Sequence, residues 1–171
     1  MQNYFELFDL ETSFFVDDEA LKKAYQAQVT RFHPDNFATK SQAEQLQALQ
    51  NTSLVNSAYT ALKTPLNRAS YLLNLEDVNP FDEKDTNMDA NFLLSQIELR
   101  EQLEGIKEQQ DSLALDEFIE RVQDFIRDNV ASISEAFMQS KDLQEIKTLV
   151  RELKFYDQLN KEANILMDEW L

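Results

Sequence analysis

Cysteine is absent from this chain of 171 residues, and histidine and glycine each occur only once. Without cysteine the chain has no disulfide, no thiolate ligand for zinc or for an iron–sulfur cluster, and no thiol nucleophile. One histidine is too few for a His-rich zinc site or a di-iron helical bundle. One glycine is too few for a phosphate-binding loop or a dinucleotide fingerprint. We therefore expect no metal site, no cofactor and no enzymatic activity.

Long apolar runs are missing as well. No stretch approaches the roughly 20 apolar residues that cross a bilayer. The first six residues resemble neither a secretory signal nor an arginine-rich leader. The lack of cysteine also permits a reducing compartment. The expectation is a cytoplasmic protein without a membrane partner.

Basic residues are scarce relative to acidic ones, at 16 against 32, and the net charge is −16. This balance opposes binding to nucleic acid and to anionic membranes, because both depend on Lys and Arg that neutralise phosphate. The charge is also uneven along the chain. Residues 1–75 carry 8 acidic and 6 basic residues, a net charge of −2, whereas residues 76–171 carry 24 and 10, a net charge of −14. The asymmetry predicts two functionally different halves and no nucleic-acid partner.

With one glycine and three prolines the chain can form few tight turns, so the predicted fold class is all-α. The predicted domains are residues 1–75, a polar linker over 76–88, and an antiparallel three-helix bundle over 89–171. Helices are expected over residues 4–8, 17–33, 41–63, 65–75, 89–109, 113–139 and 141–170.

The helical periodicity of apolar residues predicts which side chains form the core. The predicted core positions are Leu21, Tyr25, Val29 and Phe32; Val55, Ala58, Tyr59 and Leu62; Phe92, Leu99, Leu103 and Ile106; and Ile146, Leu149, Val150 and Leu153.

The single histidine lies in a distinctive setting. Residues 32–37 read Phe-His-Pro-Asp-Asn-Phe, and they separate a helix that carries Lys22 and Lys23 from a helix that ends with the pattern Asn-x-Ala-Tyr-x-x-Leu over residues 56–62. With Arg68 downstream, this arrangement resembles a J-domain, an N-terminal helical hairpin with a His-Pro-Asp loop. A simpler alternative is that the histidine only caps the preceding helix, where a charged imidazole interacts favourably with the helix dipole.

The resemblance extends over essentially the whole chain. Residues 65–73 and 92–101 are similar to those of the HscB family of iron–sulfur co-chaperones, and the absence of cysteine fits the bacterial members. This resemblance implies two partners. The J-domain would dock on the DnaK-type ATPase HscA and stimulate ATP hydrolysis, and the C-terminal bundle would deliver the scaffold protein IscU as client.

The resemblance also implies the residues that contact the ATPase chaperone. Lys22 and Lys23 would meet an acidic surface on this partner. His33, Pro34 and Asp35 would act as the switch, with Pro34 stiffening the loop and Asp35 accepting charge-assisted bonds from an arginine of the chaperone. Asn36 stands where many J-domains have lysine, which removes one positive charge.

A second apolar face is predicted on the first helix of the bundle. Leu93, Ile97 and Leu94 lie about 100°, 140° and 200° around the helix from Phe92. Phe155 lies about 180° from Ile146 on the third bundle helix, so it too is expected to point away from the core. From the residues alone, the favoured interpretation is that this face packs against another part of the chain. The resemblance instead implies a client-binding patch of Leu93, Leu94, Ile97 and Phe155, rimmed by Glu98 and Glu101.

Other functions stay open at this point. The chain could be a general J-protein for unfolded clients, or a structural helical adaptor in which the histidine loop is incidental. The carboxylates of Glu98, Glu101, Glu104 and Glu108 could take part in acid–base chemistry, but such a run on one helix is typical of a solvated face.

Overall fold

The computed structural model describes residues 2–171, and this part of the chain contains helices and no strand. The all-α prediction is therefore confirmed. The chain forms two compact units, the first ending at Leu75 and the second beginning at Glu76. No helix within the described residues is long and apolar enough to cross a membrane.

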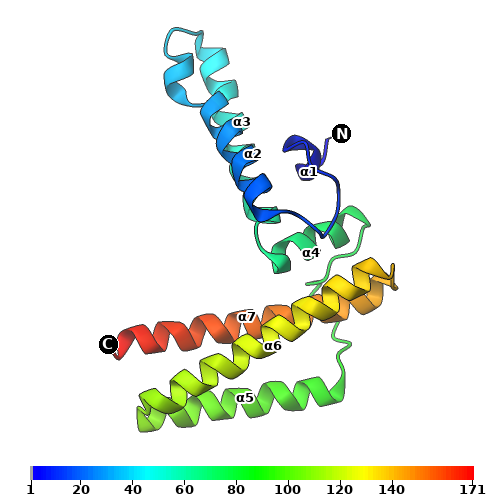
Figure 1. Ribbon diagram of the computed structural model, residues 1–171, viewed down its shortest axis with the longest axis vertical. Coiled ribbons are helices and arrows are strands. Elements are labelled where there is room, and N and C mark those ends of the chain that lie inside the picture. Colours follow the sequence, from blue (N-terminus) through cyan, green and yellow to red (C-terminus); the bar gives the residue numbers. More distant parts are fainter. Residues whose placement is uncertain (1) are drawn as a thin grey trace. The chain divides into compact units, whose positions relative to one another are not determined.

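The first unit is built around a helical hairpin (Figure 1). Its elements are α1 (Tyr4–Leu7), α2 (Asp18–Arg31), the 3-10 turn η1 (Pro34–Phe37), α3 (Gln42–Leu62) and α4 (Pro65–Leu75).

Local signals explain where these helices begin. The Asp17 side chain accepts the backbone N–H groups of Glu19 and Ala20, and the Ser41 hydroxyl accepts the N–H of Glu44. Both caps satisfy N–H groups that have no partner within the helix. The predicted starts of α2 and α3 are confirmed, and Pro65 occupies the first position of α4 as expected.

The core of the first unit joins α1, α2 and α3. Its buried residues are Phe5, Phe8, Leu21, Val55, Ala58 and Leu62, and Tyr25, Val29, Phe32 and Tyr59 pack against them. The aromatic rings of Tyr25 and Tyr59 stack with centroids 4.1 Å apart. All eight positions predicted for these two helices therefore face the core, although four of them are only half-buried.

The second unit is an antiparallel bundle of α5 (Ala90–Gln109), α6 (Ser112–Met138) and α7 (Leu143–Glu169) (Figure 1). Its core includes Phe92, Leu99, Leu103, Leu115, Phe118, Val122 and Leu159. The connections are short and use no glycine. Gln110 and Ser140 adopt left-handed backbone conformations, each with φ of 51°, and Gln110 donates its N–H back to the last turn of α5.

The polar segment before the bundle belongs to the second unit and is fastened to α7. The carboxylate of Asp85 accepts a hydrogen bond from Lys147 and lies 3.4 Å from Nη1 of Arg151. The hydrogen bond from Lys147 is the main reason that the pKa of Asp85 is lowered. The ammonium of Lys154 sits 4.1 Å from the centre of the Phe81 ring. Within the predicted linker, residues 76–88, the part from Phe81 onward is thus held along the bundle. The assignment of different functions to the two units stays a prediction.

Candidate partner-binding sites

The His-Pro-Asp loop lies at the end of the hairpin and is ordered by its own side chains. His33 has an extended backbone, as expected for a residue before proline. Its Nδ1 accepts the N–H of Asp35 at 3.2 Å, so the imidazole caps the η1 turn that follows rather than the end of α2. The Asn36 side chain donates to the Thr30 carbonyl at 2.7 Å and ties the turn back to α2.

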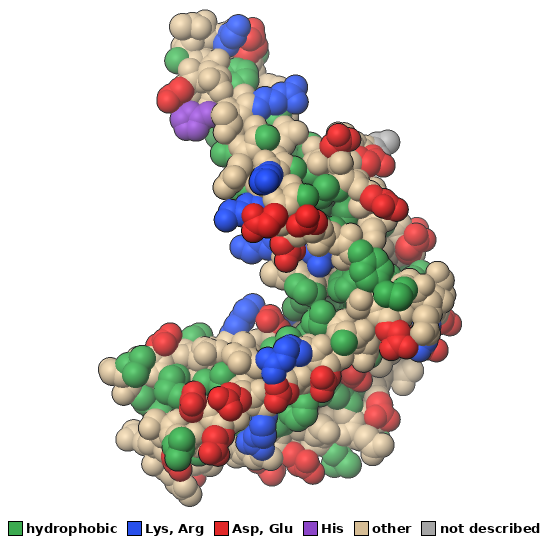
Figure 2. Space-filling view, viewed as in Figure 1, with side chains coloured by type: hydrophobic (Ala, Val, Ile, Leu, Met, Phe, Trp, Pro, Cys, Tyr) green, Lys and Arg blue, Asp and Glu red, His purple; other side chains and the backbone are tan. Residues whose placement is uncertain are grey.

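The same geometry leaves the polar groups of this loop available to a partner. The Asp35 side chain is 90% exposed, and the imidazole of His33 stands at the surface (Figure 2). An Nδ1 that accepts a hydrogen bond is unprotonated, so in neutral His33 the other ring nitrogen carries a proton to donate. Lys22 and Lys23 are exposed on α2. The loop therefore presents a carboxylate and an imidazole on a turn that proline stiffens, and the preceding helix carries exposed cations.

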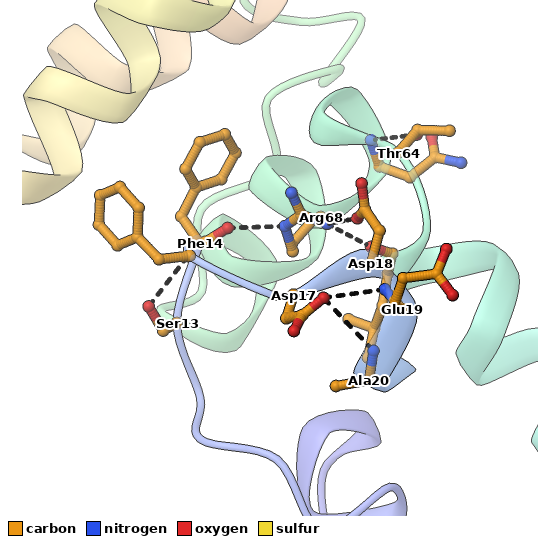
Figure 3. Close-up of polar contacts among 11 residues, drawn as sticks. Ser13, Phe14, Asp17, Asp18, Glu19, Ala20, Thr64 and Arg68 are labelled. Atoms are coloured by element: carbon orange, nitrogen blue, oxygen red, sulfur yellow. Dashed lines mark hydrogen bonds and ion pairs between the residues drawn. The ribbon is translucent and has the colours of Figure 1, made fainter. Parts of the chain in front are cut away.

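Arg68 is a residue whose role sequence reasoning missed. It is buried on α4, where its Nε donates to the Phe14 carbonyl at 2.8 Å and its Nη1 donates to the Leu62 carbonyl at 2.8 Å (Figure 3). The guanidinium also lies over the Phe14 ring, and the Asp18 carboxylate is 3.9 Å away.

Burial lowers the pKa of Arg68, and the charge of Asp18 acts in the opposite direction. The two hydrogen bonds join the connection between α1 and α2 to the end of α3, and so they hold the base of the hairpin. The sequence did contain one signal of this buried role, because Arg68 is an arginine inside the apolar stretch of α4.

The second apolar face predicted on α5 is present, and its side chains are exposed rather than packed in the core of the bundle. Leu93, Leu94 and Ile97 are 43%, 58% and 55% exposed, and none of them joins the bundle core. Glu98 and Glu101 are exposed on the same helix. A row of large apolar side chains with acidic neighbours is typical of an interaction surface.

The expectation that Phe155 points away from the core is wrong. Phe155 is only 9% exposed, and its ring packs edge-to-face on Phe92 at 5.8 Å, under the guanidinium of Arg100. The physical reason is that α7 contacts both α6 and α5. A residue opposite the stripe that faces α6 therefore meets α5 instead of water, which a single helical wheel does not reveal.

The comparisons with known proteins cover both units. Residues 3–71 match the DnaJ domain, and residues 88–164 match the family described as the HSCB C-terminal oligomerisation domain. The "Co-chaperone protein HscB homolog" of Photobacterium profundum is 37% identical over 165 residues, which are 96% of each chain. The homolog of Aliivibrio salmonicida is 38% identical over 170 residues, 99% of each chain. The chain belongs to the HscB co-chaperone family.

Solved HscB structures share the fold. The chaperone HscB from Vibrio cholerae matches with a TM-score of 0.87 and 38% identity, over 99% of this chain and 100% of that one. The human co-chaperone protein HscB matches with a TM-score of 0.89 and 30% identity, over 96% of this chain and 82% of that one. Membership in a J-domain co-chaperone family implies a partner chaperone of the Hsp70 type and a client.

Within residues 2–171, no group of three or more His, Asp or Glu side chains is arranged to hold a metal ion. Glu152 is a partly buried carboxyl of the bundle that accepts a hydrogen bond from Asn129 at 3.4 Å. Burial raises the pKa of Glu152, and the negative charge of Asp89 adds to the effect. This group belongs to the packing of α7 against α6 and is a structural feature rather than a site.

Proposed function

We propose that this chain stimulates ATP hydrolysis by an HscA-like chaperone and delivers an IscU-like scaffold protein to it, in support of iron–sulfur cluster assembly in the cytoplasm. The observation that carries the proposal is the exposed His-Pro-Asp turn, presented by one unit of a chain whose other unit exposes an apolar row. An adaptor with two partners needs these two separate surfaces.

The first unit would act on the ATPase. Lys22 and Lys23 would steer the encounter with an acidic face of the chaperone, because complementary charge raises the rate of association. Asp35 would then accept bonds from a cationic side chain of the chaperone, and His33 would donate from the ring nitrogen that the η1 turn leaves free. Pro34 limits the conformations of the loop before binding, which lowers the entropy lost on docking.

The second unit would hold the client. Leu93, Leu94 and Ile97 would contribute apolar contact area, and Glu98 and Glu101 would orient the partner through charge. The chain would carry out no covalent step, since hydrolysis belongs to the ATPase and the cluster to the scaffold. A general J-protein for unfolded clients is the competing function, and it would not require one folded partner.

Steady-state ATP hydrolysis by the HscA-like chaperone, with and without the scaffold protein, tests the proposal. Wild type should stimulate hydrolysis and the scaffold should add to it. D35N should lose both effects, whereas E11Q, which removes a carboxylate elsewhere on the first unit, should keep them. L94A/I97A should keep the stimulation seen without scaffold and lose the added effect. Absence of stimulation by wild type would refute the assignment of the partner.

A further inference from the structure

The proposed client patch adjoins an arginine of α5 that contacts a carboxylate and an aromatic ring of α7. Leu93, Ile97 and Arg100 recur at i, i+4 and i+7 on α5 and so share one face. Nη1 of Arg100 donates to Oε2 of Glu162 at 2.7 Å, and the guanidinium lies 5.5 Å from the centre of the Phe155 ring. A carboxylate beside an aromatic face is a favourable environment for guanidinium and ammonium groups.

The contact between Arg100 and Glu162 is easily exchanged. The two side chains are 45% and 51% exposed, so water competes for both groups and the pair adds little to stability. Phe155 does not depend on Arg100 for its position, because its ring also packs on Phe92. The Phe155 ring therefore keeps its place when the arginine leaves, and the Glu162 carboxylate beside it becomes available to another cation; we call this pair the cradle.

The acidic side chains of α5 favour a cation at the cradle, and the two bases of α7 that line the hollow beside Phe155 are already engaged, Arg151 with Asp85 and Lys154 with the Phe81 ring. Four glutamates lie on α5 (Glu98, Glu101, Glu104 and Glu108) against the two bases Arg100 and Lys107, and Glu162 approaches from α7. Such an excess attracts basic side chains and repels carboxylates.

We propose that Glu162 and Phe155 form a binding site for a basic side chain, Arg or Lys, of the client that docks on Leu93, Leu94 and Ile97, and that Arg100 occupies this site in the free protein. The inference rests on the client-binding function proposed above. It gives Phe155 a definite part in that function, since the ring would offer its face to the incoming cation while it keeps its contact with Phe92.

Isothermal titration of the purified IscU-like scaffold protein into wild type, R100Q and E162Q tests the proposal. R100Q empties the cradle and should tighten binding about two- to fivefold, the effect expected for releasing an exposed ion pair. E162Q removes the carboxylate and should weaken binding by a similar factor. R127Q and D124N make the same charge changes at an exposed ion pair on α6, and they serve as matched controls.

The opposite pattern would overturn the proposal. If R100Q weakens binding and E162Q tightens it, Arg100 itself holds a carboxylate of the client. If R100Q and E162Q change the affinity for the scaffold protein no more than R127Q and D124N do, the cradle does not take part in client binding. Self-association of R100Q that E162Q abolishes, measured by sedimentation, would identify a second copy as the donor and would also overturn the assignment to a client.

A second measurement does not need the scaffold protein. Titration of R100Q with N-acetyl-arginine amide should shift the Phe155 ring protons in NMR spectra at millimolar concentrations, and R100Q/E162Q should show no such shift. If the scaffold does not bind wild type at all, the proposed function fails while this titration still decides whether the cradle exists. Absence of a shift in R100Q would refute the cradle directly.

Discussion

Replacing Arg68 with alanine should destabilise the first unit and leave the second unchanged. The substitution removes two hydrogen bonds from a charged donor and leaves the carbonyls of Phe14 and Leu62 without these partners. Hydrogen bonds to charged groups contribute about 1.5–3 kcal/mol each. Allowing for partial replacement by water, the loss is about 3 kcal/mol. For a domain of this size that corresponds to a fall in Tm of roughly 12–24 °C.

The distribution of aromatic residues provides the assay. The only tryptophan, Trp170, lies in the second unit, whereas four of the five tyrosines lie in the first. In R68A, the Tm of thermal unfolding followed by the near-UV circular dichroism of tyrosine should fall. The Tm followed by the fluorescence of Trp170 should stay unchanged. K40A, which removes an exposed cation of the same unit, should shift neither signal. A change below about 1 kcal/mol in R68A would refute the view that this arginine holds the base of the hairpin.

Two further predictions concern the bundle. G105A should stabilise it by about 0.5–1 kcal/mol in urea unfolding, because Gly105 lies inside α5 and an added Cβ would meet nothing within 4 Å; a destabilised variant would contradict this. The raised pKa of Glu152 means that the folded chain holds this proton more tightly than the unfolded chain does. Its contribution to stability is therefore fully present below the ordinary pKa of a glutamate carboxyl and is lost as the pH rises through the raised pKa of the folded chain. E152Q should reduce the change in the free energy of unfolding over this pH range, whereas the exposed control E117Q should leave this change as it is in wild type.

Much of the fold could be predicted because its signals are local. Asp17, Ser41 and Pro65 mark helix starts by their own chemistry, and the observed helices differ from the expected ones by only a few residues at their ends. The apolar stripe of α5 was also readable, because a helix that packs on one side of a bundle has a single buried face.

The errors arose where a residue depends on contacts distant in sequence. Phe155 was assigned to the surface because its buried face is defined by α5, which lies more than forty residues earlier in the chain. Arg68 belonged to the pattern that resembles a J-domain, but its hydrogen-bond acceptor, the Phe14 carbonyl, is 54 residues away. No local feature of the sequence indicates that this carbonyl lies beside Arg68. The η1 turn was expected only as a loop, since it depends on the His33 ring accepting from Asp35.

The arrangement of the chain as two consecutive units has a consequence for its synthesis. Every contact of Arg68 described above lies within the first 75 residues, and the core of the bundle is built from residues 88 and beyond. Domains generally fold as units, with the N-terminal one first as the chain leaves the ribosome, and helical domains rich in local contacts fold fast. The His-Pro-Asp turn can therefore be complete before the bundle is complete.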